Sequence, residues 1–215
     1  MAVGAILWDL DGVIVDSMEY HFEAFREVLT GRSGDLTREE YFGELIGLPN
    51  DAILERLLGP LAQDEVSHLK YAKEEAYRRR IVRNVRALPG ALELVARASE
   101  AGVRQAIVSS TPRENIALIL RSLQLADAFA TFVGEEDVLR GKPNPEGFLL
   151  AADRVSIAPE ACVVIEDAPE GIAAGKAAGM RCIGVTTTRH ADRLTQADLV
   201  VDNLEDAIVT EFLFG

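Results

Sequence analysis

The chain has 215 residues, of which 48% are hydrophobic and 27% are charged, values that are typical of a globular protein and argue against disorder. Its formal net charge is −13, from 35 acidic residues against 22 Lys and Arg, which opposes binding to nucleic acid or to an anionic membrane surface. No window reaches the roughly 18 apolar residues of a membrane span, and the first residues do not resemble a signal peptide, so we expect a cytoplasmic protein with a small-molecule partner.

The first apolar run, residues 3–8, ends at two acidic residues, Asp9 and Asp11. Side chains two positions apart in an extended chain point to the same face, so both carboxylates are predicted to face the space beyond the strand. From Ser17 to about Arg86 the pattern is helical without an intervening strand, which predicts a helical cap inserted after the first strand. Helices of this segment are predicted near residues 20–30, 38–46, 51–58 and 64–83.

After residue 87, short apolar runs without alternation are separated by segments of helical spacing. This pattern predicts an α/β fold with a Rossmann-like parallel sheet covered by helices on both faces. Residues 1–16 and 87–215 would form this core, and residues 17–86 the helical cap. The later strands are predicted at 106–108, 131–133, 163–165, 182–185 and 199–201, and the helices between them at 91–101, 114–123, 147–155 and 171–178. Cys162 and Cys182 each open an apolar run, and we expect both to be buried and without a disulfide.

Polar residues follow the later strands as well. Ser109 and Ser110 come after the second strand, Lys142 lies in the loop after the third, and Glu166 and Asp167 end the fourth. The carboxyl ends of parallel strands meet at one edge of the sheet, where open α/β folds bind ligands. The sequence therefore predicts one polar site assembled from four segments.

Signals for helix starts accompany two of these strand ends. Thr111 is predicted to cap a helix whose first position is Pro112, and Asn144 to cap a helix that Pro145 opens. Backbone amides at helix starts, together with the positive charge of Lys142, favour an anionic ligand at this edge.

Four carboxylates would meet at the same edge: Asp9, Asp11, Glu166 and Asp167. Two unit charges about 4 Å apart repel by about 4 kcal/mol at an effective dielectric of about 20, so a divalent cation would relieve the crowding. Oxygen ligands without a His or Cys cluster indicate Mg²⁺ rather than zinc. Mg²⁺ and Lys142, beside a carboxylate nucleophile and a second carboxylic acid, form a set suited to phosphoryl transfer.

Four motifs, taken in order, resemble those of the haloacid dehalogenase-like phosphohydrolase superfamily, in its branch of β-phosphoglucomutase and related sugar-phosphate phosphatases. These motifs are Asp9-Leu10-Asp11-Gly12, Ser109, Lys142 and Glu166-Asp167. The resemblance extends over nearly the whole chain. It implies a Mg²⁺-dependent phosphatase that acts on a small phosphomonoester such as a sugar phosphate.

The resemblance also implies roles for individual residues. Asp9 would attack phosphorus to form an aspartyl phosphate, and Asp11 would protonate the leaving oxygen and then activate water. By the same resemblance, Ser109, Lys142 and the backbone amides near Leu10 and Ser110 would hold the phosphoryl group, and Asp9, the main-chain carbonyl of Asp11 and Asp167 would hold Mg²⁺, with Glu166 assisting.

Two residues of the cap are candidates for substrate contact. The run Glu19-Tyr20-His21-Phe22 is similar to the mutase sequence at the same place, so His21 is expected either to contact substrate or Asp11 or to serve as a structural histidine. In the mutase an arginine holds the phosphate that is not transferred, and the matching position here is Asn50. An uncharged amide is a weak anion clamp.

The substitution at position 50 favours a phosphatase over a sugar-phosphate mutase, which is the alternative. A further alternative is a catalytically silent protein that binds a phosphorylated ligand. We expect the chain to act as a monomer, because enough surface remains for a single copy to function.

Overall fold

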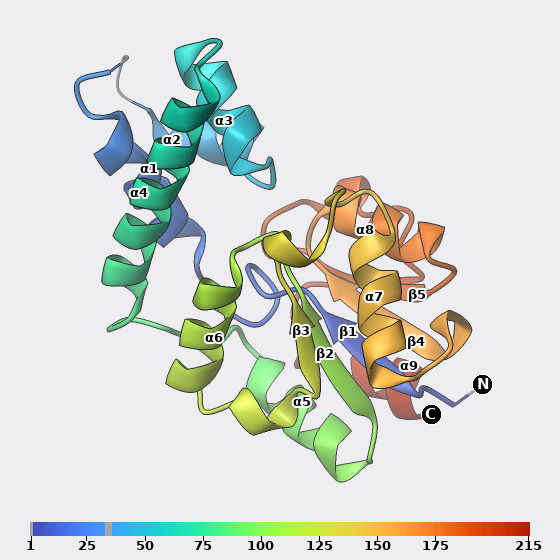
Figure 1. Cartoon of the computed structure of the whole chain (residues 1–215). Coiled ribbons are helices and arrows are strands. Elements are labelled where there is room, and N and C mark those ends of the chain that lie inside the picture. The colour runs from blue at the N-terminus through green and yellow to red at the C-terminus, as the bar shows by residue number, and fades with distance from the viewer. Residues whose placement is uncertain (1, 33–35) are drawn as a thin grey trace. The chain divides into compact units, whose positions relative to one another are not determined.

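The computed structural model of the chain describes residues 2–32 and 36–215 and contains a six-stranded parallel sheet of order β3-β2-β1-β4-β5-β6 (Figure 1). Trp8, the last residue of β1, pairs with Ile107 of β2 on one side and with Ile165 of β4 on the other, so β1 is a central strand. The segment that follows β1 therefore starts at the same edge of the sheet at which β2 and β4 end. The strands are β1 (Ala5–Trp8), β2 (Arg104–Val108), β3 (Thr131–Val133), β4 (Cys162–Glu166), β5 (Arg181–Val185) and β6 (Leu199–Val201).

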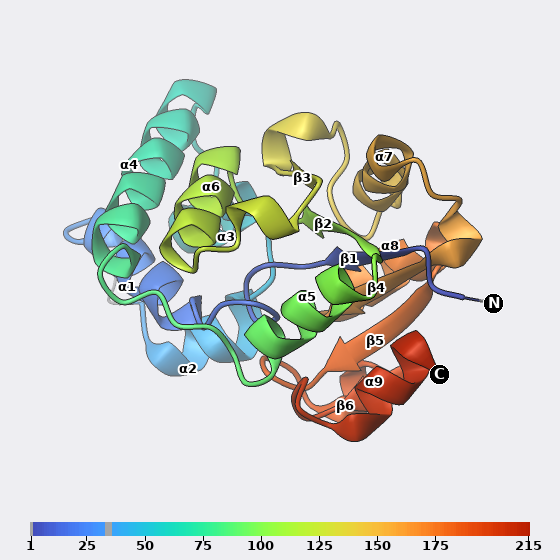
Figure 2. The ribbon, with the colours of Figure 1, turned by 90° about the horizontal axis from the view of Figure 1, so that it is seen from below.

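Helices cover both faces of this sheet. The pair α7 and α8 lies on one face, and α5 and α9 lie on the other (Figure 2). Phe148, Ala151, Ala152 and Val155 form the buried stripe of α7, at the spacing that places side chains on one side of a helix. The helices of this part are α5 (Ala91–Glu100), α6 (Arg113–Ser122), α7 (Glu146–Val155), α8 (Pro169–Ala177) and α9 (Ala207–Phe214), with short 3₁₀ turns at Ala126–Ala128, Glu135–Asp137, Pro159–Ala161 and Ala191–Arg193.

The predicted α/β class, the parallel sheet and the helices on both faces are confirmed. Each predicted strand lies on an observed one, and the first is shorter at its start than the predicted 3–8. Helix α9 was not predicted. Both cysteines are buried and free.

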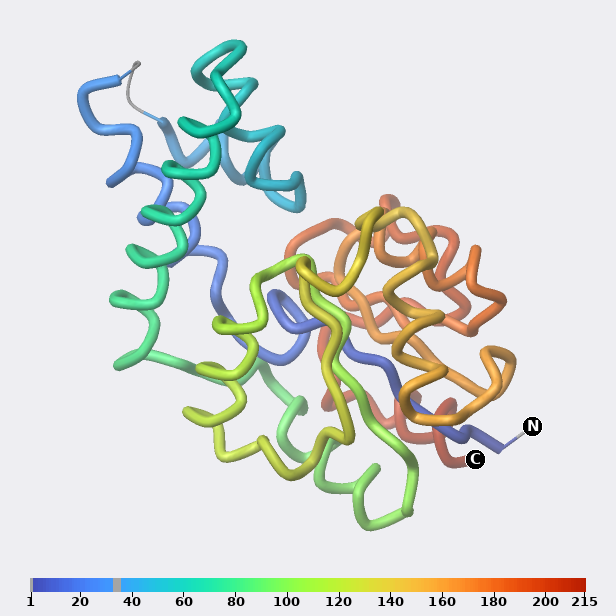
Figure 3. Tube along the Cα trace, in the orientation of Figure 1, coloured from blue at the N-terminus to red at the C-terminus, as the bar shows by residue number. Residues whose placement is uncertain are grey.

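Contacts divide the chain into two compact units, residues 1–16 with 86–215 and residues 17–85. The first unit holds the sheet. The chain leaves it after β1 and re-enters it ahead of α5, as the trace in Figure 3 shows. No helix among the described residues is long and apolar enough to cross a membrane.

The second unit is helical, and its core forms chiefly between α1 and α4, around Phe22, Phe25, Leu54 and Leu69. Its helices are α1 (Met18–Leu29), α2 (Arg38–Glu40), α3 (Asn50–Leu58) and α4 (Gln63–Ile81), with a π-helical turn at Tyr41–Leu45.

The helix predicted near residues 38–46 is present, but its type changes, because α2 continues directly into the π-helical turn at Tyr41–Leu45. The amide of Ile46 donates to the carbonyl of Tyr41, five residues earlier, at 2.9 Å. This wider turn leaves Tyr41 buried, with its ring 5.5 Å from that of Phe22. The apolar spacing of the segment resembles that of an α-helix, so the pattern alone did not reveal the change of helix type.

Candidate active site

The segment after β1 turns tightly and presents Asp9 at the carboxyl edge of the sheet. The amide of Asp9 donates to the carbonyl of Ile165 at 2.9 Å, which continues the pairing with β4. The carbonyl of Leu10 then accepts the amides of Ile14 and Val15 at 2.9 and 3.0 Å, which closes the turn. Asp9 is buried and Asp11 is half-buried.

Lys142 lies at the centre of the predicted site. Its Nζ donates to Asp9 Oδ1 at 2.5 Å, to Glu166 Oε1 at 2.6 Å and to the carbonyl of Val108 at 2.9 Å. These acceptors stand at or just beyond the ends of β1, β4 and β2. One ammonium group therefore joins three neighbouring strands at the edge where the sequence predicted a ligand site.

Lys142 does not balance the negative charge around it. Burial raises the pKa of Asp9 well above its usual value; the charge of Lys142 opposes this rise, and the charges of Glu166, Asp167 and Asp11 add to it. Burial and the charge of Glu166 likewise raise the pKa of Asp167. Burial alone would lower the pKa of Lys142, but the charges of Asp9 and Glu166 raise it above its usual range. Several carboxyl groups therefore surround a single ammonium group, and a further cation at this site would be stabilised by their negative charge.

The two acids at the end of β4 have different surroundings. Oε2 of Glu166 accepts the amides of Asp167 and Ala168 at 3.0 and 3.1 Å, just ahead of α8. Gly171, in the first turn of α8, lies against the Glu166 carboxylate, and a Cβ there would overlap it. Asp167 is buried as well, and its Oδ2 accepts a hydrogen bond from the hydroxyl of Thr188.

Two threonines after β5, which the sequence did not single out, contact residues of the candidate site. The hydroxyl of Thr187 donates to the carbonyl of Gly12, and that of Thr188 to Asp167. A signal was present, because this polar run follows a buried strand on the same edge of the sheet as the other motifs.

The loop after β2 carries the predicted phosphate contacts. Ser109 is buried and its Oγ accepts the amide of Thr111 at 3.2 Å, whereas Ser110 is exposed. The amide of Ser109 donates to the carbonyl of Val133 at 3.0 Å, which ties the loop to the end of β3. Ser109 directly follows Val108, whose carbonyl binds Lys142.

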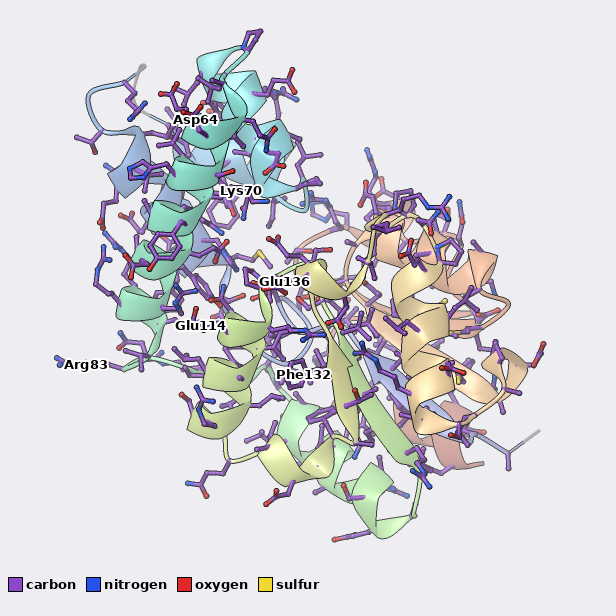
Figure 4. All side chains as sticks on the ribbon, viewed as in Figure 1. Asp64, Lys70, Arg83, Glu114, Phe132 and Glu136 are labelled. Atoms are coloured by element: carbon purple, nitrogen blue, oxygen red, sulfur yellow. The ribbon has the colours of Figure 1, made fainter. Side chains whose placement is uncertain are left out.

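The predicted cap of α6 was wrong. This helix begins at Arg113, and the hydroxyl of Thr111 accepts a hydrogen bond from Asn115 Nδ2 at 3.0 Å. Glu136, which is labelled in Figure 4, follows β3. Its carboxylate accepts the first helical amide, that of Arg113, at 3.0 Å. An acid that is distant in sequence thus caps the helix, and a local pattern cannot show this.

The predicted cap of the next helix was close to correct. Asn144 Oδ1 accepts the amide of Glu146 at 3.1 Å, so Asn144 does stabilise the start of α7. The helix begins at Glu146, one residue later than the predicted position of Pro145.

The donor set fits a hard divalent cation. Among the described residues, no group of three or more Asp, Glu, His or Cys side chains is arranged to hold a metal ion. The ligands implied by the family resemblance are different, namely two carboxylates, Asp9 and Asp167, and the main-chain carbonyl of Asp11. All three offer oxygen. Burial, and after it the acidic neighbours, raise the pKa of Asp9 and of Asp167, so a bound cation would favour the ionised form of both carboxyls.

The two candidate residues of the second unit belong to one buried polar cluster. Lys73 Nζ lies 2.9 Å from His21 Nδ1 and 2.7 Å from Glu74 Oε1, which also accepts Asn50 Nδ2 at 2.8 Å. The ring of His21 stacks on that of Tyr77 with centroids 4.0 Å apart. The sequence reasoning missed Lys73 and Glu74, because charged residues on a long helix are usually exposed.

Comparisons with known proteins agree with this architecture. The model of the family described as haloacid dehalogenase-like hydrolase matches residues 6–185. Hexitol phosphatase A of Escherichia coli (strain K12) is 32% identical over 211 residues, which cover 98% of this chain and 96% of that protein. β-Phosphoglucomutase of Bacillus subtilis (strain 168) is also 32% identical over 211 residues, covering 94% and 90%. The crystal structure of CbbY from Rhodobacter sphaeroides in complex with phosphate has a TM-score of 0.86 at 27% identity and covers 95% of this chain and 96% of that one.

Proposed function

The chain belongs to the haloacid dehalogenase-like hydrolase family, and from this membership we propose that it is a Mg²⁺-dependent phosphatase that hydrolyses a small phosphomonoester through an aspartyl phosphate formed at Asp9. The observation that carries the proposal is the position of Lys142, whose Nζ lies 2.5 Å from Asp9 Oδ1 and 2.6 Å from Glu166 Oε1. A fixed positive charge beside a buried carboxylate suits a transferring phosphoryl group.

In the first step, a carboxylate oxygen of Asp9 forms a bond to phosphorus while the bond from phosphorus to the ester oxygen breaks. Asp11 gives its proton to that leaving oxygen, so the alcohol departs neutral. Ser109, Lys142 and the amides near Leu10 and Ser110 bind the phosphoryl oxygens and stabilise the charge that they carry.

In the second step, Asp11 is ionised and accepts a proton from water as the water oxygen attacks phosphorus. The bond between phosphorus and the Asp9 oxygen breaks, inorganic phosphate leaves, and Asp9 returns to its starting form. Asp11 is protonated again and ready for the next ester. Asp9, ionised, is therefore the nucleophile, and Asp11, protonated in the first step and ionised in the second, is the acid–base catalyst.

We propose that Mg²⁺ binds to Asp9, Asp167 and the main-chain carbonyl of Asp11, with Glu166 assisting. When bound, it would offset the negative charge of the carboxylates and of the phosphoryl group. Asp9 needs this, because burial and its acidic neighbours otherwise favour its protonated, non-nucleophilic form.

The relatives support a phosphorylated sugar or polyol as the substrate. They include a hexitol phosphatase and, at 31% identity, a phosphorylated carbohydrates phosphatase of Thermotoga maritima. Their names give a class of small molecule, and the acidic net charge of −13 agrees with a partner that is not a nucleic acid. That the chain acts as a monomer stays a prediction.

A sugar-phosphate mutase is the second candidate, because a β-phosphoglucomutase is 32% identical to the chain. The amide of Asn50 counts against it, since this side chain donates to the buried carboxylate of Glu74 at 2.8 Å. A side chain held by one anion is a poor clamp for the second phosphate of a bisphosphate intermediate. His21 and Asn50 as substrate contacts stay predictions.

A panel of sugar and polyol phosphates tests the proposal. We expect phosphate release that requires Mg²⁺ and that Asp9→Asn abolishes. Incubation with β-glucose 1-phosphate and a trace of the bisphosphate separates the candidates, because a mutase yields glucose 6-phosphate and a phosphatase yields free phosphate. Absence of release from every ester, with and without Mg²⁺, would instead support a silent binding protein.

A further inference from the structure

Three segments that are far apart in the sequence meet at the carboxylate of Asp167. The hydroxyl of Thr188, in the loop after β5, donates to Asp167 Oδ2 and lies 3.3 Å from the main-chain oxygen of the same residue. Gly12, from the segment after β1, lies next to both residues. A Cβ on Gly12 would lie 2.8 Å from Asp167 Cγ and 3.0 Å from Thr188 Cγ2.

The same loop also holds the backbone of Gly12. The hydroxyl of Thr187 donates to the Gly12 carbonyl, one residue after Asp11. Two successive threonines therefore fasten the two segments from which the proposed Mg²⁺ ligands come. Asp167 is only 4% exposed, so its carboxylate is oriented by protein contacts rather than by bulk water.

A carboxylate turns about two side-chain bonds, and a metal site needs it in one orientation. Hydrogen bonds from neighbouring groups commonly fix metal-binding carboxylates in this way. A hydroxyl that donates to Oδ2 restricts the rotation of the Asp167 carboxylate at no cost in charge.

We propose that Thr188 is a positioning residue that orients Asp167 for Mg²⁺ binding. This inference rests on the proposed function, and within it assigns a role to a loop that none of the four motifs includes. Thr188 does not touch the reacting atoms and acts only through Asp167.

Thr186 provides a matched control in the same loop. Its hydroxyl donates to Asp202 Oδ1 at 2.9 Å, and Asp202 is an exposed residue after β6. The substitution Thr186→Val removes the same chemical group two residues away, without touching Asp167. A change shared by both valine variants would reflect the loop in general, and a change confined to Thr188 would reflect the bond to Asp167.

Calorimetric titration with Mg²⁺ alone measures the effect independently of catalysis. We expect Thr188→Val to raise the Kd for Mg²⁺ by about tenfold or more, as loss of such supporting bonds typically does. Thr188→Ser, which keeps the hydroxyl, should stay within about threefold of the wild type, and Thr186→Val should match the wild type.

Different results overturn different claims. Equal Mg²⁺ affinity in wild type and Thr188→Val, or an equal loss in Thr188→Val and Thr188→Ser, would refute the role of Thr188 while leaving the proposed phosphatase intact. No Mg²⁺ binding by the wild-type protein would refute the metal site and this role together. Circular dichroism confirms that each variant is folded, and if the valine variant does not fold, comparing Thr188→Ala with Thr188→Ser puts the same question.

Discussion

Lys142 Nζ donates a hydrogen bond to Asp9 Oδ1 at 2.5 Å, although 133 residues separate the two in the sequence. The same ammonium binds Glu166 at 2.6 Å and the carbonyl of Val108 at 2.9 Å. The strand order accounts for this meeting, because β1 lies between β2 and β4 and all their carboxyl ends share one edge. The topology of the sheet therefore brings together the residues proposed for phosphoryl transfer.

Replacing this ammonium should reduce activity strongly. In Lys142→Met, Asp9 and Glu166 lose their shared cation, and the phosphoryl oxygens lose a donor. We expect kcat/KM to fall by about 100- to 1,000-fold, the usual effect of removing one donor to a developing charge. Lys176→Met is the control, because Lys176 forms a partly exposed ion pair with Asp198 at 2.8 Å. Steady-state kinetics of both variants checks this, and equal activities would contradict it.

Gly12 should be required for the site and not only for the turn. Its φ of +84° favours glycine, and a Cβ there would press on the Asp167 carboxylate. Gly179 has a φ of +79° but no atom within 4 Å of such a Cβ. Gly12→Ala and Gly179→Ala should each lose about 1 kcal/mol of stability from backbone strain. Only Gly12→Ala should also lose activity. Denaturant unfolding measures the stability of both variants, and steady-state kinetics measures their activity. A fully active Gly12→Ala enzyme would show that close approach of residue 12 to the Asp167 carboxylate is not required.

Asp137 should make the stability of the protein depend on pH in the acid range. The guanidinium of Arg113, which outweighs burial, holds the pKa of this carboxyl well below its usual value, and Arg154 and the amide of Gly134 also donate to it. A depressed pKa gives stability that is fully present above the unfolded value of about 3.9 and is lost as the pH falls toward the folded value.

Comparison with Asp137→Asn isolates this contribution. Near neutral pH the variant should be less stable by about 2 kcal/mol, the typical worth of a hydrogen-bonded charged group. The difference should shrink as the pH falls below about 4, because the wild-type carboxyl is then protonated as well. Urea unfolding across this range measures it, and a difference that is constant with pH would be the contrary result.

His21 should carry its proton on Nε2. An ammonium group only donates hydrogen bonds, so Lys73 Nζ at 2.9 Å makes Nδ1 of His21 the acceptor. Lys73 Nζ also donates to Glu74 Oε1 at 2.7 Å. Two-bond ¹H–¹⁵N spectra of the imidazole rings distinguish the tautomers, with the exposed His68 as an internal reference. A protonated Nδ1 on a neutral ring would contradict the arrangement.

Much of the sheet, and the meeting of the candidate site residues at its edge, could be predicted from local pattern and the rules of parallel sheets. Buried parallel strands read as short apolar runs, and Asp9, Lys142 and Glu166 each follow such a run. Helix α9 was missed because its sequence, Ala-Ile-Val-Thr-Glu-Phe-Leu-Phe, is rich in β-branched and aromatic residues and has no clear polar face.

Contacts between distant segments could not be predicted. Glu136 caps α6 across 23 positions of sequence, and Thr188 reaches Asp167 across 21. Lys73 is a charged residue on a long helix, and only the packing of α1 against α4 explains its burial. Each contact needs the three-dimensional arrangement before its partner is known.

Rapid acid quenching followed by peptide mass spectrometry can show whether Asp9 becomes phosphorylated during turnover. We predict that the peptide containing Asp9 gains one phosphoryl group when the enzyme is quenched with substrate and Mg²⁺. In Asp11→Asn, where water is not activated, this species should accumulate with p-nitrophenyl phosphate, because the nitrophenolate leaves without being protonated. We also predict no labelled peptide and no turnover in Asp9→Asn. A phosphoryl group on another residue, or undiminished phosphate release by Asp9→Asn, would show that Asp9 is not the nucleophile.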